Sequence, residues 1–371
     1  MTPHASWSPP ARGLIVAAAF VIVLAGMQGA ASLLGPVLLA AFIAVVATPP
    51  LRLMRRYGAP KWVALLIIGF VLFDFGTLFA LATTGALEGF RHTLPSYQER
   101  LVLLMGQLGN WLESLGMANS REAVPDLFDP ALAMSLTRTF LSNASSLFST
   151  GLLVLFTVLF ILLEAAGMPA KLKAAFKPTA ETDARLQKML SSINQYMVIK
   201  TLASLATAFF IWVWLWFLGL DFATLWALLA FLLNFVPFVG SILMAVPAIL
   251  LALVQTDIQT TLLVALGYLV VNTAIGSILE PKIMGKGLGI STLAVFLSLL
   301  FWGFVFGTVG VFLSVPLTMV IIIALDASPL TRPIAILLGP DLAADSGAGE
   351  TAADQAQGLP GQERQDTQQG Q

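Results

Sequence analysis

The sequence predicts an all-α integral membrane protein with about eight membrane segments, including two broken or re-entrant helical hairpins in an inverted repeat. Three observations lead to this fold class. The 371-residue chain is 58% hydrophobic and 11% charged, with a mean hydropathy of +0.88, whereas soluble domains carry about 25% charged residues. Several uncharged stretches are longer than one membrane pass, and two of them share a short sequence similarity.

The composition also limits the classes of function. The chain has no cysteine, so it has no disulfide, thiolate ligand or cysteine nucleophile. His4 and His92 are the only histidines, too few for a multi-histidine metal site. No basic tract supports nucleic-acid binding. We therefore expect no cofactor, no metal and no nucleic acid. The expected partners are the lipid bilayer and a small-molecule or cation substrate.

The alternation of apolar and charged stretches predicts the order of segments. An N-terminal tail (1–12) precedes three transmembrane helices (13–84), and a break near Gly29–Gly35 predicts a tight hairpin between the first two. The later units are an extracytoplasmic amphipathic insert (85–138), a fourth transmembrane helix (139–167), a basic amphipathic cytoplasmic connector (168–200), a helix plus broken hairpin (201–256), a second such unit (257–325) and a disordered cytoplasmic tail (326–371).

A heptad-like stripe runs through the insert, with apolar residues spaced by four and three. Its members are Tyr97, Leu101, Leu104, Leu108, Trp111 and Leu115. The stripe could cover the membrane or its own protomer, or it could contact another subunit. Fewer than three full heptads are weak evidence for a coiled coil, which favours the first interpretation.

Residues 222–256 are the most informative stretch, because thirty-five uncharged residues surround a break. A continuous helix of this length would run roughly 50 Å, and the hydrocarbon core is only about 30 Å thick. Asn234, Pro237 and Gly240 lie in the middle, and proline and glycine disfavour a helix interior. We expect two shorter helices that meet within residues 234–241. Broken backbone at membrane depth needs protein or a wet cavity to satisfy its polar groups.

Basic loops predict the orientation of the chain. Residues 52–61, 171–200 and 282–286 are basic and are expected in the cytoplasm. Counting passes then places both ends of 222–256 outside, so this stretch must enter the membrane and return. By the same reasoning, residues 287–325 enter and return from the inside. Both chain termini are expected in the cytoplasm.

The two doubled stretches resemble each other in sequence. Residues 238–247 (FVGSILMAVP) are similar to residues 308–316 (TVGVFLSVP), with one residue of slippage. Secondary transporters build a midplane site from inverted repeats of discontinuous helices. The residues expected to shape the breaks or act in gating are Pro237, Gly240, Pro247, Gly307, Gly310 and Pro316.

Four polar residues are candidates for binding substrate or ions: Asp74, Asn234, Asn272 and Glu280. Asp74 lies near the middle of the third apolar helix, where a charge costs about 3 kcal/mol, so it should face protein or water. It could couple transport to protons or cations, or it could form a hydrogen bond between helices while protonated. The amides of Asn234 and Asn272 could bind a polyol or a cation, or join helices. Glu280 is a candidate gate or cation ligand, or a partner of Lys282 or Lys286.

Several motifs resemble the autoinducer-2 exporter family of bacterial permeases. They are residues 234–237 (NFVP) with Gly240 and Pro247, residues 279–286 (LEPKIMGK), residues 288–303 (LGISTLAVFLSLLFWG), residues 307–310 and residues 313–319 (LSVPLTM). The resemblance implies an inner-membrane permease of about eight segments and a homo-oligomer, a pentamer being one candidate. Some members of the family export autoinducer-2, and others exchange sodium or lithium for protons. Thr292 and Thr308 depart from the family pattern.

We therefore predict a secondary transporter of the bacterial inner membrane that moves a small polar signalling molecule such as autoinducer-2. The alternatives are a sodium or lithium/proton antiporter and an oligomeric channel. No GxxxxGK[ST], HExxH or GxSxG motif occurs in the sequence, so neither ATP-driven transport by this chain nor an intramembrane enzyme is expected.

Overall fold

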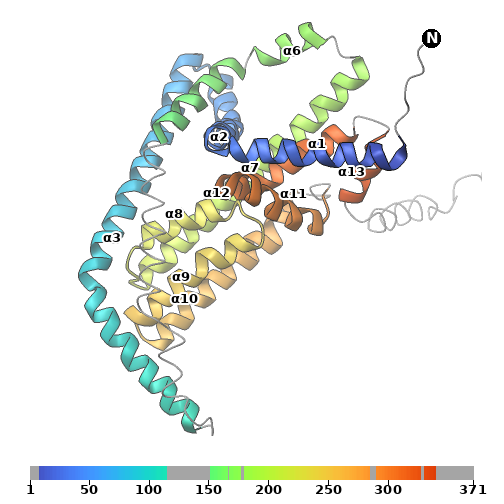
Figure 1. The fold of residues 1–371 in the computed structure, drawn as a ribbon. Coiled ribbons are helices and arrows are strands. Elements are labelled where there is room, and N and C mark those ends of the chain that lie inside the picture. The colour runs from blue at the N-terminus through green and yellow to red at the C-terminus, as the bar shows by residue number, and fades with distance from the viewer. Residues whose placement is uncertain are drawn as a thin grey trace, which may run out of the picture.

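The computed structural model describes residues 8–114, 151–165, 167–176, 179–284, 290–326 and 330–339. Within these ranges the secondary structure is entirely helical (Figure 1). Five helices are long and apolar enough to cross a membrane, and several apolar helices are shorter. This confirms the all-helical fold class for the described part of the chain. Part of the tail predicted as disordered, residues 326–371, is helical, because α13 occupies Arg332–Leu338. The tail from residue 340 onward and the second half of the predicted insert lie outside the described residues.

The helices follow one another in the order shown in Figure 1. They are α1 (Pro9–Gly29), α2 (Ala31–Arg56), α3 (Lys61–Ser114), an unlabelled helix (Gly151–Ala165), α6 (Met168–Phe176), α7 (Ala180–Phe217), α8 (Ala223–Leu233), α9 (Val239–Gln255), α10 (Ile258–Val271), a π-helical segment (Asn272–Leu279), α11 (Glu280–Met284), α12 (Thr292–Asp326) and α13 (Arg332–Leu338).

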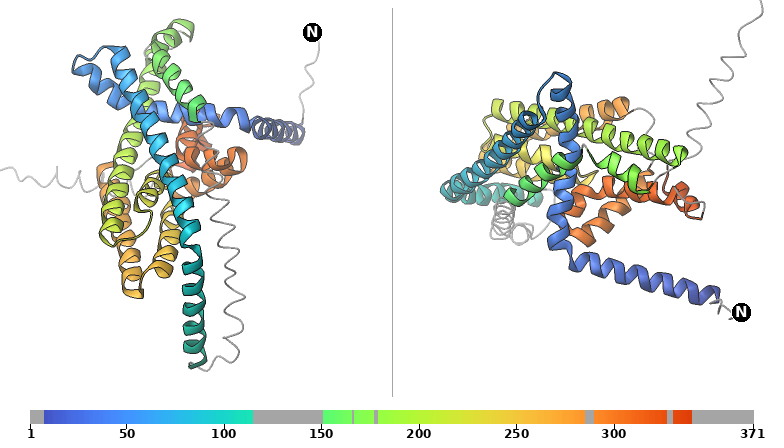
Figure 2. Two further views of the ribbon diagram at one scale, coloured as in Figure 1. Left: turned by 90° about the vertical axis from the view of Figure 1, so that its left-hand side faces the viewer. Right: turned by 90° about the horizontal axis from the view of Figure 1, so that it is seen from above.

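The first two helices do not form the tight hairpin expected from the sequence. The break falls at Ala30, inside the expected stretch, but α1 leaves α2 at an angle instead of packing along it (Figure 2). Ala30 keeps near-helical hydrogen bonds, since its amide donates to Gly26 O and its carbonyl accepts from Leu34 N. The backbone therefore kinks without reversing, because Gly29 and Gly35 permit a turn but do not force one.

Two predicted boundaries lie inside continuous helices. The third membrane helix and the start of the insert are both part of α3, which extends past the ends of α9 and α10 (Figure 1). Tyr97, the first residue of the heptad-like stripe, packs on its own chain against the cluster formed by α7, α9 and α10. The connector and the fifth helix are likewise both part of α7. Residues 180–217 contain neither proline nor glycine, so nothing in the local sequence ends a helix between them.

The chain reverses direction between α8 and α9, at residues 234–238, and we call these two helices hairpin 1. Phe238 has φ of 59°, a value that non-glycine residues rarely adopt. Gly240 follows at the start of α9, where an added Cβ would lie 1.9 Å from the carbonyl oxygen of Leu233 on α8. The two arms therefore touch through their backbones at the tip. Only glycine permits this contact.

A second reversal divides α12 into two arms, residues 292–306 and 308–326, which we call hairpin 2. Gly307 adopts φ of 61° and ψ of −141° at the tip. The indole nitrogen of Trp302 donates a hydrogen bond of 3.0 Å to Thr318 Oγ1, whereas sixteen residues of continuous helix would separate the two by about 24 Å. Gly310 again brings backbones into contact, since its Cβ would lie 1.8 Å from Trp302 O. The two residues in contact are eight positions apart in the sequence here, Trp302 and Gly310, and seven positions apart in hairpin 1, Leu233 and Gly240.

The open ends of the two hairpins lie near opposite ends of α7. At the base of hairpin 1, Gln255 bonds to Asp221 and Gly219, just after α7 ends. The open end of hairpin 2 instead packs through Val295, Val315 and Met319 on Tyr196 and Met197, in the N-terminal half of α7. Helix α7 is therefore the element along which both hairpins are placed.

Candidate functional site

One face of α7 carries four buried polar side chains, which we call the α7 polar stripe. Its members are Tyr196, Lys200, Ser204 and Thr207. Spacings of four, four and three residues place them on the same side of the helix. Their exposed fractions run from 0% to 8%, and Lys200 is the only charged residue in the buried set of the described chain. Toward the C-terminal end of α7, after Thr207, the same face becomes apolar at Ile211 and Leu215.

Lys200 forms an ion pair with Glu280 of α11. The ammonium nitrogen lies 2.9 Å from one carboxylate oxygen and 3.0 Å from the other. Only 10% of the Lys200 side chain and 12% of the Glu280 side chain are exposed. Removing two charges from water is expensive, and their mutual attraction offsets this cost only when the geometry is good. Both Glu280 oxygens therefore accept hydrogen bonds from the same ammonium in this conformation.

The π-helical segment turns Glu280 toward α7. Tyr268 and Gly267 of α10 already face α7, and an added Cβ on Gly267 would lie 2.1 Å from the Trp214 indole nitrogen. Glu280 lies twelve residues after Tyr268, which corresponds to about three and a third turns of α-helix. An uninterrupted α-helix would therefore point Glu280 about a third of a turn away from the side on which Tyr268 lies. In residues 272–279 each residue turns through a smaller angle than in an α-helix. Glu280 therefore returns to the side that faces Lys200.

The tip of hairpin 1 contacts the stripe one helical turn further along. The side-chain nitrogen of Asn234, Nδ2, donates a 2.9 Å hydrogen bond to Ser204 Oγ, and both side chains are buried. Phe235 fixes the tip through edge-to-face contacts with Phe42 of α2 and Phe231 of α8. Four residues of helix span about 6 Å. The Asn234–Ser204 contact and the Lys200–Glu280 pair are therefore neighbours along α7.

The buried polar groups of hairpin 2 are bonded within the hairpin itself. Ser298 and Ser314 donate to the carbonyl oxygens of Val295 and Val311, three residues earlier in each case. Thr318 accepts from Trp302 across the two arms. These bonds hold the hairpin together, so we assign them a structural role. Gly307, Gly310 and Pro316 lie within the same hairpin.

The other sequence candidates lie in different places. Asp74 is exposed on α3, among exposed apolar residues such as Phe70 and Phe73. It is remote from the stripe in sequence and makes no hydrogen bond or ion pair with the described residues. Asn272 is the first residue of the π-helical segment and is partly buried. Pro237 lies in the turn of hairpin 1, and Pro247 lies inside α9. The structure therefore brings Asn234 and Glu280 to α7, and leaves Asp74 on the surface of the single chain.

Lys200 and Ser204 were missed by reasoning from sequence. Lys200 was counted among the bases of the connector, because it is the last charge before an apolar run. A signal was nevertheless present, since Tyr196, Lys200, Ser204 and Thr207 repeat at helical spacing where α7 becomes apolar. Polar residues on one face of a membrane helix point to the protein interior.

The base of hairpin 1 is fastened to α3 at the opposite end of the molecule. The Tyr97 hydroxyl donates a 2.8 Å hydrogen bond to Asp221 Oδ2, and Arg100 donates to Thr256 O at 2.5 Å. Burial, followed by the neighbouring Asp221 carboxylate, raises the pKa of the Tyr97 hydroxyl above its usual value. Tyr97 therefore remains a hydrogen-bond donor at any physiological pH.

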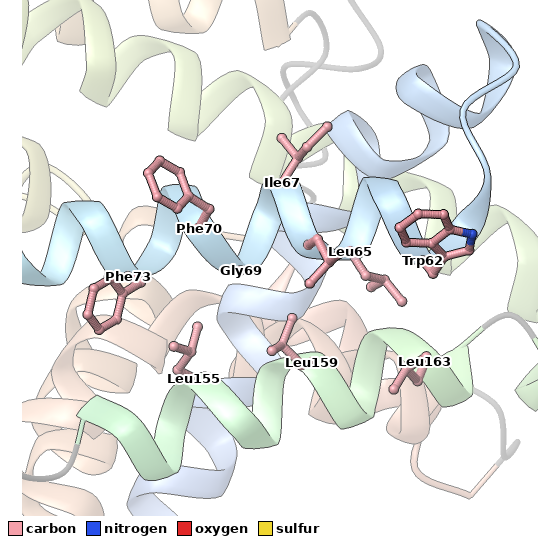
Figure 3. Close-up of a pocket in the computed structure, with 10 residues that line it drawn as sticks. Trp62, Leu65, Ile67, Gly69, Phe70, Phe73, Leu155, Leu159 and Leu163 are labelled. Atoms are coloured by element: carbon pink, nitrogen blue, oxygen red, sulfur yellow. The ribbon is translucent and has the colours of Figure 1, made fainter.

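An apolar groove of about 850 Å³ lies between α3 and the helix Gly151–Ala165. Its lining includes Trp62, Phe70 and Phe73 of α3 and Leu155, Leu159 and Leu163 of the second helix. Figure 3 shows Phe73 on the side of α3 that faces these leucines, whereas Phe70 points away from them. The groove offers almost no hydrogen-bonding group to a small polar solute. The α7 polar stripe is therefore the better candidate site.

A helical membrane protein in which two hairpins meet a helix with a buried polar stripe falls in the class of membrane transporters. A family model described as AI-2E family transporter matches residues 14–329. The chain belongs to this family of bacterial multi-pass membrane proteins, which confirms the resemblance noted in the sequence. It is accordingly a transport protein and not an enzyme.

Similar proteins cover nearly the whole chain. The AI-2 transport protein TqsA of Escherichia coli (strain K12) is 39% identical over 325 residues, which is 88% of this chain and 94% of TqsA. A putative transport protein of Haemophilus influenzae is 38% identical over 88% of this chain and 96% of its own length. The putative transport protein YhhT of Escherichia coli (strain K12) is 36% identical over 88% and 94%.

Proposed function

We propose that the protein is a secondary transporter of the bacterial inner membrane that moves a small polar signalling molecule, with autoinducer-2 as the first candidate. The carrying observation is that Asn234 and Glu280, from two different hairpin-containing units, reach neighbouring positions on the α7 polar stripe. The similarity to a protein named for AI-2 transport supports the choice of substrate.

The proposed architecture is an inverted repeat of two units, each a membrane helix followed by a re-entrant hairpin. The matching glycine contacts in the two tips support it, as do the open ends near opposite ends of α7. Hairpin 1 would enter from outside and hairpin 2 from the cytoplasm, and both chain termini would be cytoplasmic. A site between opposed hairpins can be opened to either side in turn, which is the arrangement alternating access requires.

Cysteine labelling tests this topology directly, because the natural chain has no cysteine. Single variants Asp221→Cys and Asp257→Cys should both react with a membrane-impermeant maleimide added to intact cells. Arg52→Cys should react only after the membrane is opened. Labelling of Asp221→Cys and Asp257→Cys from opposite sides would show that residues 222–256 cross the membrane, and would overturn the re-entrant arrangement.

We also propose that the protein acts as a homo-oligomer. Asp74 lies near the middle of an apolar helix and is exposed in the single chain. A carboxylate facing lipid at that depth is costly, whereas one facing another subunit or water is not. Much of α1 is similarly exposed, including Leu14, Val16 and Phe20. Contact with further copies of the chain would cover these surfaces.

Transport in proteoliposomes tests the proposed function and the role of Asp74. Autoinducer-2 should move saturably, and Asp74→Asn should abolish its movement if the carboxylate couples transport to an ion. Imposed proton, sodium and lithium gradients distinguish the antiporter alternative. Unsaturable conductance would identify a channel. Unchanged transport by a correctly assembled Asp74→Asn variant would remove Asp74 from the mechanism.

A further inference from the structure

We propose that Lys200 is an anion-binding group and that Glu280 is its built-in competitor, so that the solute is a small hydroxylated anion that displaces the Glu280 carboxylate. The proposal rests on the proposed function as a transporter and names the chemical class of its substrate.

The first support is the presence of a buried charge where the fold does not need one. Lys200 lies in the stretch of α7, Leu190–Phe217, that is long and apolar enough to cross a membrane, and it is 8% exposed. Apolar residues of similar volume often stabilise a protein as much as a buried ion pair or more. An ionisable residue at such a position is better explained by function, with Glu280 as its named partner.

The second support is the identity of the cation. The lysine ammonium is a compact charge on a flexible stem, whereas an arginine fork holds a carboxylate in a fixed two-point geometry. Lys200 already bonds both oxygens of Glu280 through a single nitrogen. An ammonium can transfer from one carboxylate to another oxyanion by a small rotation of its stem, so the lysine suits an exchange of partners.

The third support is the backbone that carries Glu280. The residue directly follows the π-helical segment, and Pro281 after it supplies no amide hydrogen. π-helical turns occur frequently at functional sites. Conversion of residues 272–279 to α-helix would rotate Glu280 by about a third of a turn, away from Lys200. The carboxylate can therefore leave while α7 remains intact.

The fourth support is the set of neighbours that an incoming solute would meet. Ser204 and Asn234 lie one turn from Lys200 on one side, and Tyr196 lies one turn away on the other. These groups can hydrogen-bond to hydroxyls within about 6 Å of the ammonium. Exchange also leaves Lys200 paired with one negative charge throughout, so the ammonium is never buried without a partner. The site therefore fits a sugar-acid-sized monoanion.

Three probes of similar shape test the charge requirement: ribose, ribonate and ribose 5-phosphate. Their binding to the purified full-length protein is measured by isothermal calorimetry. The wild type should bind the two anions more tightly than ribose. Glu280→Gln should bind ribonate about tenfold more tightly than the wild type if the competitor occupies Lys200 about nine-tenths of the time. The double variant Lys200→Met/Glu280→Gln, which buries no unpaired charge, should bind ribonate no better than ribose.

The exposed pair Lys171–Glu164 provides a matched control within the same chain. Glu164→Gln should leave all three affinities unchanged. The proposal is overturned if Glu280→Gln does not strengthen ribonate binding, or if the folded double variant keeps the preference for anions. Calorimetry does not require transport of autoinducer-2. A charge preference that depends on Lys200, in a protein that fails to move autoinducer-2, would therefore refute that substrate and leave this inference standing.

Discussion

Replacing Gly240 with alanine is expected to prevent hairpin 1 from forming, and Gly310→Ala is expected to do the same to hairpin 2. In each case the new Cβ would lie less than 2 Å from a backbone carbonyl oxygen of the opposite arm. A backbone atom cannot rotate away as a flexible side chain can, so the arms must separate. Overpacking typically costs 1–3 kcal/mol and occasionally more, and we expect each variant to lose about 3 kcal/mol or more.

Helix propensity predicts the opposite result. Alanine is favoured over glycine by about 1 kcal/mol in a helix interior, and Gly240 and Gly310 lie in the first turn of their helical arms, so alanine should gain no more than this. Steric overlap should exceed this gain. Gly26→Ala in α1 is the matched control, because no atom lies within 4 Å of its added Cβ. Thermal unfolding in detergent measures both effects. A wild-type melting temperature for Gly240→Ala would show that the arms do not touch at this point.

The hairpins were predictable because their signal is local. Two uncharged stretches exceed the length of a membrane pass, and each contains glycine and proline near its middle. The FVG and TVG motifs align at Gly240 and Gly310, the two glycines that make the backbone contacts at the tips. A length constraint and a pattern of helix breakers therefore indicated where the chain reverses. They did not indicate which carbonyl oxygen each glycine approaches, since that depends on how the arms pack.

Local signals were less informative at the ends of helices. Gly29 and Gly35 led to the expectation of a hairpin between the first two helices, but Ala30 keeps helical hydrogen bonds and only a kink results. The change from charged to apolar residues at Lys200 led to an expected boundary inside α7, which is continuous. Composition reports where a helix enters the membrane. It does not report where the helix ends, because that depends on breakers and caps.

The candidate site was predictable in its members but not in its pairing. Asn234 and Glu280 stood out as polar residues in apolar surroundings. Their partners lie 30 and 80 residues away in the sequence, on one face of α7, and a separation of this size leaves no local pattern. The orientation of Glu280 depends further on the π-helical segment, which turns its side chain by about a third of a turn. None of the residue types in 272–279 is specific to a π-helical turn, so the sequence does not predict one there.

The Lys200–Glu280 pair should produce the largest effect of any charge substitution in the described chain. Lys200→Met leaves the Glu280 carboxylate buried without its partner, and breaking a buried pair in this way typically destabilises by about 3–5 kcal/mol. Lys200→Met/Glu280→Gln removes both charges and should recover most of that loss. Chemical denaturation of the two single variants and the double variant completes a thermodynamic cycle. Lys171→Met, in the exposed pair with Glu164, should leave the unfolding midpoint unchanged.

The cycle separates a structural pair from a functional one. If the pair mainly stabilises the fold, the double variant should stay clearly less stable than the wild type, although more stable than Lys200→Met, and should lose transport through that loss of stability. If the pair serves the solute, the double variant should be stable and inactive toward anions, because its helices still pack while the exchangeable charge is missing. Tyr196, Met197 and Met284 already join α7 to its neighbours through apolar contacts. The packing around the pair is therefore sufficient without the charges, and a stable double variant is the expected result.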